Sequence, residues 1–113
     1  MPALEISTNV KLDEVDLEPI FSQASDAIAS IIGRPKNLVM VVLKGSVPIS
    51  FTGTKDPAAF AQLISMGGIN SVVKRKLIKS LGAILQTHLS IPPARFFCHV
   101  VDTTAGRPPR PKL

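Results

Sequence analysis

The stretch that decides the fold is Leu38-Val39-Met40-Val41-Val42-Leu43. These six consecutive apolar residues are too few for a buried helix, and their three valines favour a strand. An apolar run without polar alternation is typical of a strand that is buried on both faces, so we expect 38–43 at the centre of a sheet. Gly33 and Pro35 stand just before it and are suited to end a preceding helix.

The residues before Gly33 predict a helix and, at the N-terminus, a first strand. Asp13 and Asp16 are candidate N-caps for a helix that runs to about Ile32. Residues 3–7 alternate apolar and polar side chains, as a half-buried strand does. One apolar stripe at helical spacing is formed by Ile20, Phe21, Ala24, Ile28, Ile31 and Ile32.

The second half of the chain contains a similar order of elements. Asn70 is a candidate N-cap for a helix that runs to about Leu89, and Pro92 stops this helix. Residues 95–101 predict a last strand, and residues 49–51 predict a short one. The apolar face of the second helix is formed by Val73, Leu77, Leu81, Ile84 and Leu85.

The order of elements repeats with an offset of 57 residues, which is the separation between Pro35 and Pro92. Each of these prolines follows a helix and precedes a strand. The same offset moves Ile6 onto Leu63, so the ambiguous segment 58–66 is predicted to be a strand. The chain then consists of two βαβ units in tandem, each with a helix over two parallel strands.

We therefore expect an α/β (α+β) fold, with a four-stranded mixed sheet and both helices on one face. A length of 113 residues suits a single domain with a substantial core. The other face of the sheet would carry alternating apolar side chains with no helix left to cover them. An uncovered apolar face of that size predicts oligomerisation.

The composition argues against several classes of protein. No window approaches 18 uninterrupted apolar residues, so we expect no membrane partner, and the N-terminus lacks the pattern of a secretory signal. The net charge of +5 could indicate nucleic acid, but the chain has no Tyr or Trp to stack on bases. Much of the excess charge lies in residues 74–76 and in the last seven residues, and we expect a solvated basic surface without nucleic acid.

The cysteine and histidine residues argue against further chemistry. Cys98 is the only cysteine, which rules out an internal disulfide and favours a reducing compartment. His88 and His99 have no further ligands at metal-binding spacing, so we expect no metal site. Cys98 and His99 are adjacent, so on a strand they point to opposite faces and cannot form a nucleophile pair.

Pro2 is a candidate general base. If Met1 is removed, Pro2 becomes a free secondary amine that titrates slightly above neutral pH, and burial lowers its pKa further. A neutral amine at physiological pH can abstract a proton. The alternative is that Pro2 only begins an edge strand, where its missing N–H does no harm.

The repeat predicts that Pro2 has polar neighbours. The start of the first strand would lie beside the start of the third strand or beside the Met66-Gly67-Gly68 turn. Accessible backbone N–H groups of this turn would suit an anionic or carbonyl oxygen, and Arg34 could hold a carboxylate. The alternative for Arg34 is a cation at a helix C-terminus. A base, a cation and exposed N–H groups together suit proton abstraction next to a carbonyl.

Several short segments, taken together and in their order along the chain, resemble the motifs of a known family. These are Pro2, Thr8-Asn9-Val10, Ile32-Gly33-Arg34-Pro35, Phe51-Thr52-Gly53, Asp56-Pro57, Ser65-Met66-Gly67-Gly68-Ile69, Arg95-Phe96-Phe97 and Asp102. Over about residues 2–102 the chain resembles the macrophage migration inhibitory factor and dopachrome tautomerase family, and residues 42–48 look most like the plant members. The resemblance implies a homotrimer of the tautomerase superfamily whose sheets line a central barrel, a small keto or enol acid as substrate, and no cofactor.

The resemblance also implies roles for four residues. Pro2 matches the family's catalytic proline, the base that moves a proton between carbon and oxygen. Arg34 stands where the family has a lysine that binds the substrate carboxylate, and Ser65 and Met66 fall at the pocket floor. The implied activity is that of a keto–enol tautomerase, an isomerase of the phenylpyruvate or dopachrome type.

Three features depart from the family pattern. Phe97 stands where the mammalian cytokine has a pocket tyrosine. His99 stands where it has an asparagine that binds substrate from the neighbouring subunit, and we take both residues as candidate substrate contacts. The usual Gly-Trp-Asn ending is replaced by a basic, proline-rich tail, 103–113, which we expect to be flexible and to follow a domain of residues 1–102.

These departures keep other functions open. The chain could be a cytokine-like signalling or interaction protein that binds a cell-surface receptor and has weak or no tautomerase activity, or a structural trimer without pocket chemistry. The ending Pro111-Lys112-Leu113 resembles the peroxisomal address Ser-Lys-Leu, so we expect the peroxisome, reached through its import receptor, or the cytoplasm.

Overall fold

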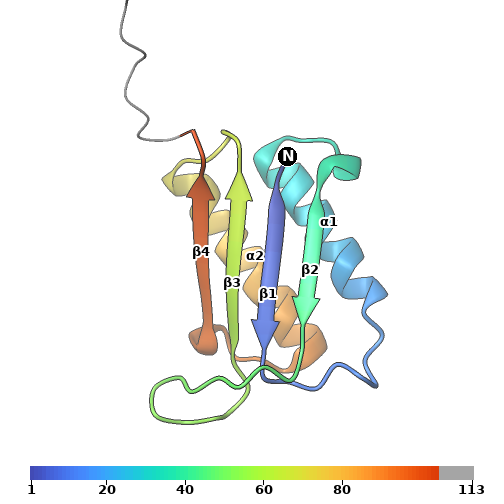
Figure 1. Cartoon of the computed structure of the whole chain (residues 1–113). Helices are drawn as coiled ribbons and strands as arrows, with labels where there is room; N and C mark the ends of the chain where they lie inside the picture. The colour runs from blue at the N-terminus through green and yellow to red at the C-terminus, as the bar shows by residue number, and fades with distance from the viewer. Residues whose placement is uncertain (105–113) are drawn as a thin grey trace, which may run out of the picture.

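In a computed structural model of the chain, residues 1–104 form a four-stranded sheet with two helices packed on one face (Figure 1). Residues 105–113, which include the whole of the Pro111-Lys112-Leu113 motif, lie outside the described part of the chain. The elements in order are β1 (Ala3–Thr8), α1 (Glu18–Ile32), β2 (Met40–Lys44), β3 (Ala59–Ser65), α2 (Ser71–Leu89) and β4 (Phe96–Asp102), with 3₁₀ turns at Lys36–Leu38 and Pro93–Arg95.

The sheet confirms the predicted tandem of βαβ units. Its strand order is β2-β1-β3-β4. Within each unit the two strands are parallel, β1 with β2 and β3 with β4, while β1 and β3 pair antiparallel where the units meet. The segment 58–66, ambiguous by pattern alone, contains β3, and the mixed α+β sheet with both helices on one face is as expected.

The prediction that residues 38–43 form a central strand was wrong. The strand β2 lies at the edge of the sheet and pairs only with β1, and Leu38 belongs to the preceding 3₁₀ turn. The strands β1 and β3 take the two central places in the sheet because they pair with each other where the two βαβ units meet. The predicted short strand at residues 49–51 is also absent, since Phe51 makes only an isolated bridge with Thr54 inside a loop.

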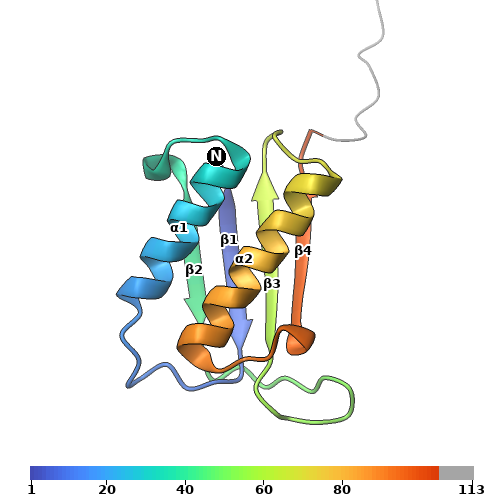
Figure 2. The same cartoon turned by 180° about the vertical axis from the view of Figure 1, so that it is seen from behind.

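The core lies between the sheet and the helices (Figure 2). The buried side chains of the helices are Ile20, Ala24, Ile28 and Ile32 from α1, and Leu77, Leu81, Leu85 and Leu89 from α2, together with the buried Gly82. They pack against inward residues of β1 and β3 such as Leu4, Ile6 and Leu63. No helix among residues 1–104 has the length and apolar character needed to cross a lipid bilayer.

One of the two predicted helix starts is confirmed. The Asn70 side chain caps α2 by accepting a hydrogen bond from the backbone N–H of Val73 at 2.8 Å. Neither Asp13 nor Asp16 caps α1, because the N-cap position is Leu17. Asp16 instead accepts a hydrogen bond from the N–H of Glu18 at 3.2 Å. Glu18 is the first residue of α1, whereas an N-cap side chain accepts from the N–H of the second or third residue.

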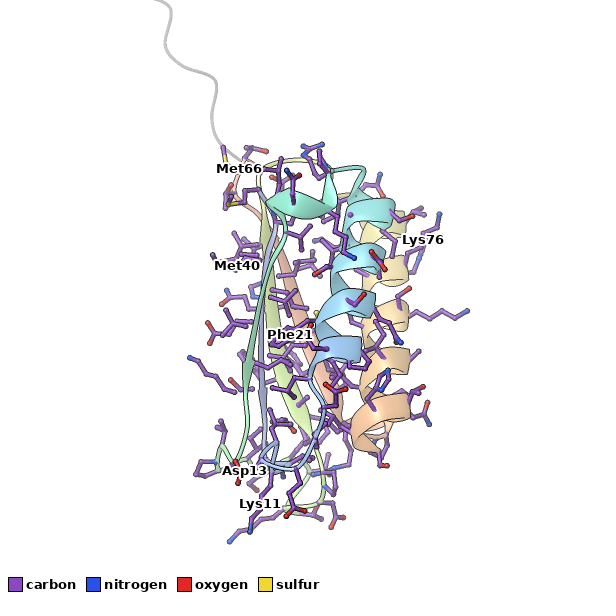
Figure 3. The ribbon with its side chains drawn as sticks, turned by 90° about the vertical axis from the view of Figure 1, so that its right-hand side faces the viewer. Lys11, Asp13, Phe21, Met40, Met66 and Lys76 are labelled. Atoms are coloured by element: carbon purple, nitrogen blue, oxygen red, sulfur yellow. The ribbon has the colours of Figure 1, made fainter. Side chains whose placement is uncertain are left out.

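The uncovered face of the sheet is less apolar than the sequence predicted. Figure 3 shows Met40 on this face, on the side of the sheet away from the helices. The strand register and the alternation of side chains give three rows across the face: Met40, Ala3, Ile64 and Val101; then Val42, Glu5, Gln62 and His99; then Lys44, Ser7, Phe60 and Phe97. The middle row is mostly polar, and Glu5 forms a 3.0 Å ion pair with Lys44. Apolar side chains are therefore concentrated at the two ends of the face.

Candidate active site

Pro2 is fully buried at the start of β1. Its carbonyl oxygen accepts a hydrogen bond from the N–H of Met40 at 3.0 Å. Because Ala3 pairs with Ile64, the register carried one residue further places Pro2 opposite Ser65, at the end of β3. Of the two expected surroundings, the turn after β3 is therefore the neighbour of Pro2, and the start of β3 is at the far end of the sheet.

The turn beside Pro2 is held by the residues around it. Gly67 and Gly68 have φ of 81° and 77°, a conformation that glycine adopts without steric cost. The hydroxyl of Ser65 donates to the carbonyl of Gly67 at 2.8 Å, and the carboxylate of Asp102 accepts from the N–H of Gly67 at 3.0 Å. The expectation that this N–H is open to a substrate oxygen was wrong, because Asp102 already uses it.

Arg34 lies over the same turn. Its Nη2 donates a hydrogen bond to the carbonyl oxygen of Met66 at 3.3 Å. The left-handed Gly33 ends α1 and redirects the chain, so the half-buried guanidinium reaches the turn rather than the last carbonyls of the helix. A guanidinium has five N–H donors, so other donors of Arg34 can still bind a carboxylate.

The pocket-floor residues Ser65 and Met66 differ in exposure. Ser65 is buried, and its hydroxyl is committed to the turn. The side chain of Met66 is 61% exposed and extends from the end of the sheet, as Figure 3 shows. Pro2, Arg34, Ser65 and Met66 thus come together at one end of the molecule, where β3 and α1 end.

Phe97 and His99 are not brought to Pro2 within one chain. Phe97 lies opposite Phe60 near the start of β4, and the two rings stack with centroids 5.5 Å apart. Asp102, at the Pro2 end, is five residue steps along β4 from Phe97, which is about 16 Å along the sheet. His99 is exposed in the polar middle row.

A cavity of about 330 Å³ lies at the Phe97 end of the sheet. Its lining is mostly apolar and consists of Ile49, Ser50, Phe51, Ala58, Ala59, Phe60 and Phe97. One end of the chain therefore holds the candidate base and cation, and the opposite end holds an aromatic hollow.

Two residues shape the loop beside this cavity, Asn9 and Arg95, which the sequence indicated only as parts of the family resemblance and without a role. Arg95 donates to the carbonyl oxygens of Phe51 and Pro57 at 3.0 and 2.9 Å and lies over the Phe51 ring at 5.3 Å. Asn9 accepts from the N–H of Ala58 at 2.9 Å and donates to two further loop carbonyls. No local pattern predicts this role, because their partners lie about 40 to 50 positions away in the chain.

Cys98 and His99 point to opposite faces of β4, as predicted. Cys98 packs against the core, and burial raises the pKa of its thiol to about 11. His88, the other histidine, contacts the Gln23 side chain at 3.0 Å between the two helices. No group of three or more potential metal ligands occurs among residues 1–104.

The fold of the chain is that of the tautomerase superfamily. A family model for macrophage migration inhibitory factor (MIF) matches residues 1–107. The chain is 34% identical over 102 residues to a macrophage migration inhibitory factor homolog of Trichuris trichiura, covering 90% of this chain and 89% of that protein. It is 30% identical over 106 residues to the macrophage migration inhibitory factor of Rattus norvegicus, covering 94% and 91%.

Solved structures agree with these relatives. The macrophage migration inhibitory factor of Trichinella spiralis superposes with a TM-score of 0.81 at 32% identity, covering 88% of each chain. A homologue from Prochlorococcus marinus has a TM-score of 0.85 at 22% identity, covering 91% of this chain and 90% of the other, and shares the fold. The chain belongs to the macrophage migration inhibitory factor family. The specific likeness to plant members stays a prediction.

Proposed function

We propose that this protein is a keto–enol tautomerase of the phenylpyruvate or dopachrome type, with Pro2 as its base. The observation that carries the proposal is the burial of Pro2 beside the Met66-Gly67-Gly68 turn, with the Arg34 guanidinium over that turn. The family resemblance implies the same role for Pro2. The proposal requires the removal of Met1, because only then does Pro2 carry a basic nitrogen.

The chemistry assigned to these residues is a proton transfer. Arg34 holds the substrate carboxylate, and the Pro2 nitrogen takes a proton from the carbon next to the carbonyl. The electrons of the broken C–H bond form the carbon–carbon double bond of the enol, and the π electrons of the carbonyl move onto its oxygen. That oxygen takes a proton from solvent water, and the protonated Pro2 releases its proton to solvent. In the reverse direction the protonated Pro2 returns its proton to carbon. Burial disfavours the charged form of an amine, so a buried position suits a proline nitrogen that is to act as a base.

We further propose that the working unit is a homotrimer. The aromatic hollow at Phe97 and the candidate base at Pro2 lie at opposite ends of one chain, so a neighbouring subunit could place Phe97 and His99 over Pro2. The apolar rows at the two ends of the uncovered sheet face support such packing. Each pocket would then take its base and cation from one subunit and its aromatic wall from another.

The first experiment pairs intact mass with an enol–keto assay on the same sample, using phenylpyruvate as substrate. Clear turnover by protein that lacks Met1 supports the proposal. The variant Pro2→Gly should lose at least about a hundredfold in kcat, the contribution typical of a positioned base, while its oligomeric mass stays unchanged. A rate in Pro2→Gly equal to that of the wild type would rule out Pro2 as the base.

A cytokine-like interaction protein is the second candidate, and the exposed residues of β4 favour it. Phe97 offers no hydroxyl to a substrate and stacks on Phe60 instead, and His99 replaces the family's asparagine. Pro2→Gly also separates the two functions, in an assay of binding to a cell-surface receptor. Receptor binding that survives in this variant supports an interaction role, and loss of binding together with turnover argues against it.

A further inference from the structure

Charged residues are distributed unevenly between the two ends of the sheet and helices that residues 1–104 form, ends that can be followed in Figure 1. The end that holds Pro2 carries five cations and two carboxylates: Arg34, Lys36, Lys74, Arg75 and Lys76 against Asp26 and Asp102. The opposite end carries four cations and five carboxylates: Lys11, Lys44, Lys55 and Arg95 against Asp13, Glu14, Asp16, Glu18 and Asp56. The Pro2 end is therefore the positive end of the molecule.

The carboxylates at the Pro2 end do not neutralise the basic run, which we define as Lys74, Arg75 and Lys76. Asp26 pairs with Lys36 at 2.8 Å, and Asp102 accepts the N–H of Gly67. Within residues 1–104 the two ion pairs are those of Lys36 and Lys44, and neither includes the basic run. All three side chains of the run are exposed. Their charges therefore act on the surrounding solvent.

The basic run is not explained by the stability of α2. It lies in the first two turns of the helix, where a cation opposes the helix dipole. The sequence of α2 contains no Asp or Glu, so no side chain within the helix offsets these charges. Figure 3 shows Lys76 directed away from the sheet, on the solvent side of the helix layer. A basic run at this position costs helix stability and calls for another role.

We propose that the basic run, together with Arg34, attracts anionic substrates to the Pro2 end and makes capture depend on substrate charge. This inference rests on the proposed tautomerase function. Helix α2 starts three residues after Gly68, and the run lies within about 8 Å of the helix start. That distance is about one Debye length at physiological ionic strength, so the field reaches the start of α2, and at about 10 mM salt, where the Debye length is about 30 Å, it extends over the turn beside Pro2. Capture is fastest for a dianionic enol acid, slower for a monoanion and slowest for a neutral ester.

The test compares two charge variants with equal net charge. Lys74→Gln/Lys76→Gln removes two charges from the basic run, and Lys11→Gln/Lys55→Gln removes two exposed lysines from the opposite end. At about 10 mM ionic strength we expect kcat/KM for phenylpyruvate to fall roughly five- to tenfold in the first variant and less than about twofold in the second. The gap should close at about 300 mM, with kcat unchanged.

A neutral substrate separates steering from structural damage. The methyl ester of phenylpyruvate should be turned over equally by both variants and by the wild type. Equal losses in the two variants, or an equal loss with acid and ester, would overturn the inference.

A binding measurement keeps the inference testable if the wild type shows no turnover, an outcome that would contradict the proposed function alone. Phenylpyruvate is titrated into ¹⁵N-labelled protein, and the amide shifts of Gly67 and Gly68 are followed at both ionic strengths. We expect weaker binding at low salt in Lys74→Gln/Lys76→Gln than in Lys11→Gln/Lys55→Gln. Equal affinities in these two variants would show that the basic run does not attract the anion.

Discussion

Gly68 packs against the end of α1 at the turn beside Pro2, and its backbone is in the left-handed region. A Cβ placed on Gly68 would lie 3.0 Å from Cγ2 of Ile32, whereas one placed on Gly67 meets only Arg34 Nη2, at 3.8 Å. Both glycines have positive φ, so the two positions differ mainly in the space around them. A comparison of alanine variants at the two positions therefore separates the cost of backbone strain from the cost of steric contact.

We expect Gly67→Ala to lower the free energy of unfolding by about 1 kcal/mol and Gly68→Ala by about 2 kcal/mol or more. The first variant is destabilised only by the positive φ of its alanine, whereas the second must also displace the Ile32 side chain. Urea unfolding measures both values, with Gly53→Ala as the control at φ 78° in open space. Equal losses in Gly67→Ala and Gly68→Ala would contradict the predicted contact.

The thiol of Cys98 should react slowly in the native protein. Burial raises its pKa from 9.0 to about 11, so at pH 8 the native chain has about a hundredfold less thiolate than an unfolded chain. Alkylation by iodoacetamide, followed by mass, should be slower by about this factor without denaturant. Because the native pKa is the higher one, the unfolded state ionises first, and stability falls as the pH rises from 9 towards 11. A Cys98→Ala variant should lack this part of the alkaline loss.

At the scale of elements, the loop between β2 and β3 depends on Arg95, a residue from the 3₁₀ turn that precedes β4. The guanidinium of Arg95 donates to Phe51, Pro57 and other groups of the loop and covers the Phe51 ring. The planar guanidinium of Arg95 is a shared hydrogen-bond donor, so its removal leaves several loop carbonyls without a partner at once. The loop also supplies part of the lining of the Phe97 cavity.

We expect Arg95→Met to lower the free energy of unfolding by about 2–3 kcal/mol and to increase hydrogen exchange in residues 51–57. Arg95→Lys keeps the charge but lacks the fork, so it should recover less than half of the loss. Exchange in α1, which receives none of the hydrogen bonds of the Arg95 guanidinium, serves as the internal reference. Full recovery by lysine would show that charge, rather than the hydrogen-bonded fork, holds the loop.

At the scale of the whole molecule, the uncovered sheet face carries the proposed trimer contact. Ile64 and Ile78 are each 39% exposed, the first on the uncovered face and the second on α2. A charge at Ile64 would be buried by a neighbouring subunit, whereas a charge at Ile78 stays in solvent. The two positions are thus matched in residue type and exposure.

We expect Ile64→Glu to dissociate the protein to monomers of 12.1 kDa, while Ile78→Glu keeps three times that mass. Sedimentation equilibrium measures both. Circular dichroism should show the same helix content in the two variants, which excludes unfolding as the cause. A trimeric Ile64→Glu, or a wild type that is monomeric, would contradict the proposed assembly.

Local patterns were enough for most of the elements but not for their places in the sheet. The stripes of α1 and α2, the Asn70 cap and the 57-residue repeat predicted both helices and all four strands of the sheet. The apolar run at 38–43 was assigned to the centre of the sheet because such a run is typical of a strand that is buried on both faces. Hydropathy does not say which part of the structure covers each face. In this fold β2 lies at the edge, with its inner face covered by the core and its outer face left open.

The candidate site shows the same division. Sequence and resemblance indicated Pro2, Arg34 and the glycine turn, which the chain brings together. They did not show that Asp102 occupies the N–H of Gly67, or that Arg95 and Asn9 hold the loop beside Phe97. Hydrogen bonds between residues 35 to 50 positions apart leave no periodic signal, because each depends on how the strands are registered.

The sequence by itself determined the two βαβ units, because local propensity and spacing are properties of the chain. The resemblance of its motifs indicated the family and the residues that could carry the chemistry. Only the tertiary structure decided that β1 and β3 join the units, that Pro2 faces the end of β3, and that Phe97 lies at the opposite end of the sheet. Antiparallel pairing at the centre reverses one unit against the other, and this reversal sets the two halves of the proposed pocket apart in one chain.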